Sequence, residues 1–240
     1  MKFHRSGTAL VGVLLCCSLS ACVGGLPGSS EEPKEPAGAT SSAPGQPAVD
    51  ALLTQAGNAA RSASSVRISG ELSHEGEQMR LEVAGMVDGT NRKSSVKQKG
   101  QWVEVLTVGK KTWVKPLDQA TATAMGLPVV VVGKYLEAPT TKSGEVEAMD
   151  ARKLLEHFTS PGPEQISKAA ATLTQGNEQG RSTWVVTQKV PDGEAKIVVS
   201  ADGKGELLHV SSPALGTLSF SSWNAVPAFP APTAGQIYQK

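Results

Sequence analysis

The sequence contains little cysteine, and all of it lies near the N-terminus. Cys16 and Cys17 fall within a short apolar run, and Cys22 follows shortly after that run. The chain beyond Cys22 therefore has no disulfide, no cysteine nucleophile and no thiolate metal site. A domain built from it must be stabilised by an apolar core.

Aromatic residues and excess charge are also scarce. Aromatic side chains make up 4% of the chain, whereas sugar-binding sites usually need aromatic platforms and acyl chains need aliphatic walls. The 23 Lys and Arg residues nearly balance the 22 Asp and Glu residues, and there is no basic block. This balance disfavours nucleic-acid binding and a polybasic attachment to anionic lipid. After Cys22, no apolar run approaches the ~20 residues of a transmembrane helix.

The N-terminus has the pattern of a lipoprotein signal peptide. A basic start over residues 1–5 precedes an apolar run over residues 7–17, and Leu19-Ser20-Ala21-Cys22 then forms a lipobox. The signal peptidase must bind an extended backbone tightly, which requires small residues before the cysteine. The cysteine thiolate is the nucleophile that accepts the lipid. The sequence therefore predicts cleavage before Cys22 and attachment of the protein to the outer face of the cell membrane.

Composition then divides the chain into three parts. Residues 1–21 are the expected signal peptide, and residues 22–47 are the lipidated cysteine and a linker rich in Gly, Pro, Ser and Glu. Such a linker cannot bury a core and is expected to be disordered, with a mean reach of roughly 25–30 Å. Residues 48–240 are expected to form one folded domain.

Periodicity within this domain predicts an α+β fold with a large antiparallel sheet, apolar on one face and covered there by a few helices. Apolar residues at helical spacing predict helices near residues 49–60 and 148–158, whereas residues 166–174 fit either a helix or a strand. The most apolar stretch, residues 125–133, is interpreted as a buried strand, with a flap at a cavity mouth as the alternative. Alternating patterns between turn residues predict strands over residues 66–72, 79–83, 92–98, 101–108, 112–115, 182–190, 195–200, 206–211 and 217–223.

No arrangement of residues indicates catalysis, a metal or a cofactor. The histidines His74, His157 and His209 have no partner at metal-ligand spacing. There is no Gly-x-Ser-x-Gly elbow, and the Asp-Gly pairs lack the remaining ligands of a calcium loop. We therefore expect no catalytic residue, no metal site, no cofactor and no enzymatic activity.

The order of these segments resembles the LppX/LprAFG lipoproteins of mycobacteria and their relatives, which are similar in fold to the LolA/LolB lipoprotein carriers. The resemblance covers the whole domain but contains no single diagnostic motif. It is carried by the lipobox, the linker, the opening helix and these segments: Val66–Gly70, Ala151–Leu155, Gly176–Trp184, Asp192-Gly193, Asp202-Gly203, Ser222–Asn224 and Ala231-Pro232. It implies a strongly curved half-barrel whose concave apolar face, covered by helices, binds acyl chains.

The resemblance and the aliphatic pattern together predict a lipid-binding lipoprotein for transport or presentation. The expected partners are a lipid or lipoglycan, the membrane and an export partner protein. The alternative is a packed protein-interaction module of the cell envelope without a ligand. The expected walls of a lipid cavity are Val66, Ile68, Leu72, Leu81, Val83, Val130, Val186, Ile197 and Val199.

Overall fold

The structure is a computed structural model that describes residues 45–74, 76–138, 151–159 and 171–239. The chain divides into two units, Met1–Ser41 and Ser42–Lys240, and every described residue belongs to the second unit. The predicted signal peptide, Cys22 and the predicted linker as far as residue 44 lie outside the described residues.

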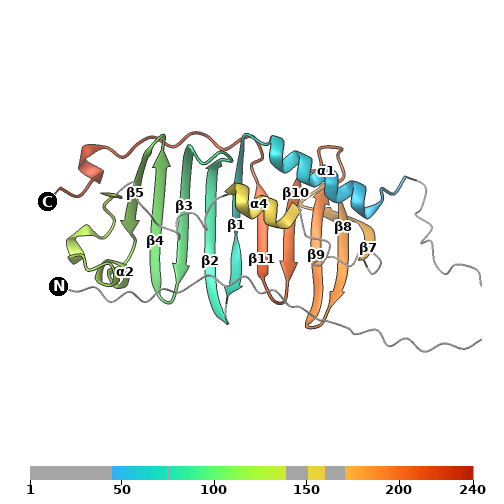
Figure 1. Cartoon of the computed structure of the whole chain (residues 1–240), viewed down its shortest axis with the longest axis horizontal. Helices are drawn as coiled ribbons and strands as arrows, with labels where there is room; N and C mark the ends of the chain where they lie inside the picture. The colour runs from blue at the N-terminus through green and yellow to red at the C-terminus, as the bar shows by residue number, and fades with distance from the viewer. Residues whose placement is uncertain (1–44, 75, 139–150, 160–170, 240) are drawn as a thin grey trace, which may run out of the picture. The chain divides into compact units, whose positions relative to one another are not determined.

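Eleven strands form one open antiparallel sheet (Figure 1). Their order across the sheet is β6-β5-β4-β3-β2-β1-β11-β10-β9-β8-β7. The strands are β1 Ser65–His74, β2 Glu77–Met86, β3 Asn91–Gln98, β4 Gln101–Val108, β5 Lys111–Pro116, β6 Leu136–Glu137, β7 Ala171–Glu178, β8 Arg181–Val190, β9 Gly193–Ser200, β10 Leu207–Ser212 and β11 Gly216–Ser221.

Two antiparallel meanders make up this sheet. One runs from β1 to β6 and the other from β7 to β11, each with neighbouring strands consecutive in sequence. The pairing of β1 with β11 joins them, with Ile68 opposite Phe220 and Gly70 opposite Leu218. The first and last strands of the domain therefore form its central seam.

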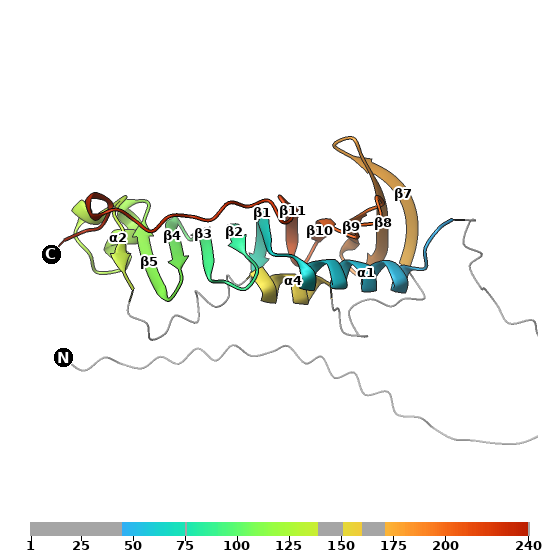
Figure 2. The same cartoon turned by 90° about the horizontal axis from the view of Figure 1, so that it is seen from above.

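The helices α1, Val49–Ser62, and α4, Ala151–Thr159, pack against each other and against one face of the sheet (Figure 2). In α1 the small and aliphatic residues follow helical spacing, and Leu52, Ala56 and Ala60 are buried in the main core. In α4 Ala151 and Leu155 are buried in the same core. The helices lie over the middle of the sheet and its β7 side, and leave β3–β5 to one side (Figures 1 and 2).

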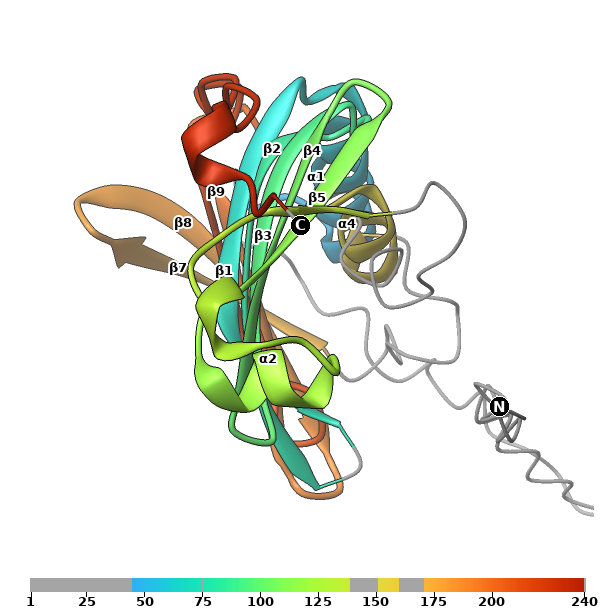
Figure 3. The same cartoon turned by 90° about the vertical axis from the view of Figure 1, so that its left-hand side faces the viewer.

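The C-terminal segment runs along the opposite side of the sheet (Figure 3). Leu106, Trp113 and Tyr135 form a second, smaller core there, with Phe229 and Ile237 packed against it. The short elements of the domain are α2 Gln119–Ala124, η1 Val129–Val131 and η3 Ala234–Gln236.

All nine predicted strands and the first predicted helix are confirmed, with bounds shifted by a few residues. The second predicted helix is confirmed from Ala151, and the ambiguous segment is a strand from Ala171 onward. Their first residues, 148–150 and 166–170, lie outside the described residues. The buried strand predicted over residues 125–133 is wrong: Pro128 and two glycines with positive φ, Gly126 and Gly133, break the run into turns and η1.

Candidate functional site

The two faces of the sheet differ in chemistry. Successive residues of a strand point to opposite faces, so the register assigns each side chain to one face. The face that carries α1 and α4, here called the helix face, is mainly aliphatic and contains the main core. The opposite face is mainly polar, with Arg67, Glu82, Lys93 and Lys97 among its residues.

Most of the predicted wall residues meet in this core. Val66, Ile68, Val83 and Val199 have no exposed surface, and Leu72, Leu81 and Val186 are also buried. Ile197 is half-buried and packs against them. These eight residues therefore lie together on the helix face, in contact with a core that includes residues of α1 and α4.

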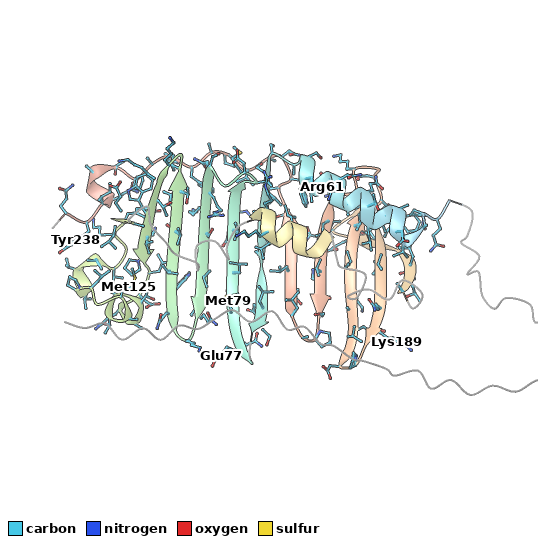
Figure 4. All side chains as sticks on the ribbon, viewed as in Figure 1. Arg61, Glu77, Met79, Met125, Lys189 and Tyr238 are labelled. Carbon is cyan, nitrogen blue, oxygen red and sulfur yellow. The ribbon has the colours of Figure 1, made fainter. Side chains whose placement is uncertain are left out.

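Val130 lies apart from the other predicted wall residues. Val130 is 67% exposed, in the turn of η1, whereas the neighbouring Val131 is fully buried. Val129 and Met125 are also exposed, so the segment after α2 presents apolar side chains to solvent. Figure 4 labels Met125 beside α2, at the β5 end of the sheet. Val130 is therefore not part of the aliphatic face, because the strand predicted for it does not form.

The helix face continues beyond the helices as a band of half-buried aliphatic side chains. We call these residues, Met79, Val96, Val103 and Val114, the apolar strip. Cross-strand pairing places Leu81, Val96 and Val103 in one row, and Val83, Ser94, Val105 and Val114 in the next. The apolar strip therefore continues the main core from strand to strand across β2–β5.

Polar side chains stand at one end of the strip. The row after Ser94 pairs Gly85, Arg92, Thr107 and Thr112 across β2–β5. The Thr107 and Thr112 hydroxyl oxygens are 3.2 Å apart, and Arg92 is buried. A buried arginine is unusual on a face that is mainly aliphatic, because arginine is mostly exposed in folded proteins.

Ser94 is the clearest anomaly of the helix face. It is 2% exposed between Val83 and Val105, and its hydroxyl makes no hydrogen bond in the part of the chain that the structure describes. On the other face, the buried indole N–H of Trp113 also makes no hydrogen bond to any described residue. A buried hydroxyl without a partner costs about 1–3 kcal/mol, so its presence requires an explanation.

Sequence reasoning missed Arg92 and Ser94 as site residues because β3 looked like an ordinary polar strand. In β3 the inward positions 92 and 94 are as polar as the outward positions 93 and 95. The pairing of Ser94 with Val83 and Val105 shows that its side chain faces the core, and Arg92, two positions away, lies on the same face.

The turn between β2 and β3 brings further charge to the same end of the sheet. A Cβ built on Gly89 would lie 4.0 Å from a guanidinium nitrogen of Arg92. Hydrogen bonds from the Thr90 backbone and side chain lower the pKa of Asp88, and the charge of Arg152 in α4 lowers it further. The guanidinium groups of Arg92 and Arg152 thus both lie near this turn.

The opposite face holds a cluster of Glu104, Lys115 and Tyr135. The Glu104 carboxylate lies 2.5 Å from the Lys115 ammonium and accepts a hydrogen bond of 2.6 Å from the Tyr135 hydroxyl. Burial alone would raise the pKa of Glu104, but these two hydrogen bonds and the charges of Lys115 and Lys93 leave it below its ordinary value. Burial and Glu104 together raise the pKa of Tyr135. The cluster links β4 and β5 to the second, smaller core, which contains Tyr135.

Within residues 45–74, 76–138, 151–159 and 171–239, no three His, Cys, Asp or Glu side chains are grouped so that they could hold a metal ion. In the same ranges, no helix has the length and apolar character needed to span a bilayer.

Comparisons with known proteins give no family. No family model matches the chain, and no curated protein matches it significantly. Among solved structures, an uncharacterized conserved protein from Thermus thermophilus is similar with 8% identity and a TM-score of 0.33, over 79% of this chain and 98% of that one. A structure of PNGF-II is similar with 10% identity and a TM-score of 0.22, over 71% of this chain and 29% of that one. Similarity at this level does not establish a shared fold or function.

Proposed function

We propose that this protein is a non-enzymatic lipoprotein of the cell membrane that binds the acyl chains of a lipid or lipoglycan, for transport or presentation. Lipid on Cys22 would attach it to the outer face of the membrane. The lipobox supports the anchor, and the aliphatic helix face supports the ligand. An export partner protein would deliver or receive the bound molecule.

The observation that carries the proposal is the apolar strip. Its four side chains are only half-buried, although they continue the fully buried rows of the main core. When another apolar group covers aliphatic surface that is partly open beside a core, the free energy of the system falls. An acyl chain is such a group, and it needs no polar contact along its length.

The size of the strip agrees with this ligand. The rows of the strip run along β2 from Met79 to Val83, the partner row of Val114, which corresponds to roughly 13 Å along a strand. An acyl chain in one membrane leaflet covers about half of the ~30 Å hydrocarbon thickness. Transfer of ten methylene groups from water to this surface would contribute roughly 8 kcal/mol before ordering costs.

The proposal extends the resemblance to the LppX/LprAFG lipoproteins. In this arrangement the sheet is a half-barrel, its concave side is the helix face, and α1 and α4 form part of the cover over the acyl chains. The burial of Leu52 and Leu155 against the sheet supports a covering role for both helices.

A second candidate is a packed interaction module of the cell envelope. The close packing of Val66, Ile68, Val83 and Val199 favours it, because these predicted wall residues already have no exposed surface. In this candidate the helix face is entirely core, and the strip is simply its margin.

Native mass spectrometry separates the two candidates. The chain from residue 22 onward, carrying Cys22→Ser, is purified without detergent from a bacterial host. The lipid carrier is expected to retain a lipid mass that organic solvent removes. A protein that shows only its bare mass, even after incubation with diacylated lipid, contradicts acyl-chain binding and favours the packed module.

A further inference from the structure

The geometry points to a head-group site at one end of the apolar strip, where Arg92 and Ser94 bind the anionic oxygen of a lipid whose acyl chain lies along the strip. This inference rests on the proposed function and specifies its ligand as an acidic amphiphile. Both carboxylate and phosphate oxygens have the chemistry that this site would recognise.

Ser94 provides the first argument. Its hydroxyl is buried on the helix face, two positions from Val96 in the strip, and has no hydrogen-bond partner among the described residues. A hydroxyl can donate one hydrogen bond, and an anionic oxygen beside the strip would accept it. A ligand at this position would thus satisfy the polar group that the protein leaves unsatisfied.

Arg92 provides the second argument. It occupies the next inward position of β3, roughly 7 Å from Ser94 along the strand, and is 7% exposed. A guanidinium carries five N–H donors in a planar fork and can bind several acceptors at once, so it suits carboxylate and phosphate oxygens. Charge-assisted hydrogen bonds of this kind are stronger than neutral ones.

The order of residues along the strands gives the ligand its orientation. The half-buried apolar side chains of Met79, Val96 and Val103 occupy one end, and Ser94 and then Arg92 follow toward the β2–β3 turn. Thr107 and Thr112 add two hydroxyls in the row of Arg92. An apolar surface with a buried cation and hydroxyls at one end matches a molecule with one acyl tail and one anionic head.

The test compares ligands that differ only in the head group. Hexadecanoate, hexadecyl phosphate and methyl hexadecanoate compete with a neutral fluorescent probe for the chain from residue 22 onward carrying Cys22→Ser. At least one of the two anions is expected to bind at least tenfold more tightly than the ester, and their ranking tells carboxylate from phosphate. Equal affinity of all three overturns the head-group site but leaves acyl-chain binding intact. No binding of any of them overturns both inferences.

Variants on β3 locate the effect. Arg92→Gln is expected to remove the preference for the anion with ester affinity unchanged, and Ser94→Ala is expected to reduce the preference about threefold. Lys93→Gln and Ser95→Ala alter the neighbouring positions on the opposite face and should leave the preference for the anion unchanged. A preference that survives Arg92→Gln, or that Lys93→Gln removes, overturns the assignment. If Arg92→Gln does not fold, the comparison of the three ligands on the protein with Arg92 intact still decides whether the head-group site exists.

Discussion

Glu104 shows how a single charged side chain is held on the polar face of this sheet. Its carboxylate lies between the Lys115 ammonium and the Tyr135 hydroxyl, and the side chains of Glu104 and Lys115 are 14% and 19% exposed. An ion pair with so little exposure is screened less by water than a surface pair. The cluster should therefore contribute to stability in a pH-dependent way.

Replacement of Glu104 by Gln tests this contribution. Because the folded-state pKa of Glu104 is lower than its ordinary value, the ionised form stabilises the fold at neutral pH. The contribution should be lost as the pH falls through the folded-state pKa. We expect Glu104→Gln to lower the free energy of unfolding by about 1–2 kcal/mol at pH 7, and by much less at pH 3.

The matched control is Glu137→Gln. Its carboxylate is 3.5 Å from the Lys111 ammonium, but both side chains are more than half exposed. A surface pair of this kind should contribute less than ~0.5 kcal/mol. Urea unfolding at both pH values measures these differences. A loss in Glu104→Gln that is the same at pH 3 and pH 7 would show that the charge of Glu104 is not responsible.

The inward aliphatic residues could be predicted from the sequence, but whether each one lines a cavity or fills the core could not. Alternation placed Val66, Ile68 and Val83 on one face correctly, because each strand pattern is local. Whether Val83 lines a space or is packed depends on the helices and strands around it, which the pattern does not contain. Arg92 and Ser94 were missed for the same reason.

Among the elements, the seam between β1 and β11 holds the two meanders together. At Gly70 the backbone of β11 comes so close that a Cβ would lie 2.0 Å from the carbonyl oxygen of Thr217. A Cβ on Gly216 would likewise lie 2.2 Å from the carbonyl oxygen of Glu71. Both positions therefore require glycine if the strands are to pair at this separation.

Gly70→Ala should weaken this seam. The added methyl group meets backbone that cannot rotate away, so β1 and β11 must separate locally, at a cost of about 1–3 kcal/mol. Gly235→Ala is the control, since a Cβ there has no atom within 4 Å. Denaturant midpoints of both variants give the comparison. Equal midpoints for Gly70→Ala and the unaltered protein would mean that the seam is looser than described.

The elements also show what sequence can predict. Hairpins such as β1–β2 and β8–β9 were predictable because turn residues and alternation lie within a few positions of each other. The β1–β11 pairing joins the two ends of the domain, and no local pattern encodes it. The short α2 was missed because it depends on Asp118, whose side chain accepts a hydrogen bond from the Thr121 backbone N–H.

For the whole molecule, the proposed anchor depends on Cys22. The lipobox predicts that Cys22→Ala leaves a protein without lipid, which is either uncleaved or released. Membrane fractionation and intact mass measure this outcome. Ser20→Ala keeps a small residue in the lipobox and should leave anchoring unchanged. If Cys22→Ala fractionates with membrane, is cleaved at the same site and carries the same lipid mass, the anchor assignment is wrong.

The proposed function requires the helix face to bind an acyl chain along the apolar strip. Val103 is a better probe of it than Val83, because Val103 is half-buried in the strip whereas Val83 is fully buried. Val103→Trp should fill the proposed ligand position with little overpacking. Val185→Trp is the control, since Val185 is half-buried on the opposite face of β8.

The most direct measurement is titration of a fluorescent fatty acid into the chain from residue 22 onward carrying Cys22→Ser, with and without each substitution. If the helix face binds an acyl chain, the parent protein should bind the probe saturably at micromolar concentrations. Val103→Trp should bind it at least tenfold more weakly and keep its melting temperature within a few degrees, and Val185→Trp should bind it unchanged. A parent protein that shows no saturable binding, together with a Val103→Trp variant that melts markedly lower, would contradict acyl-chain binding on the helix face.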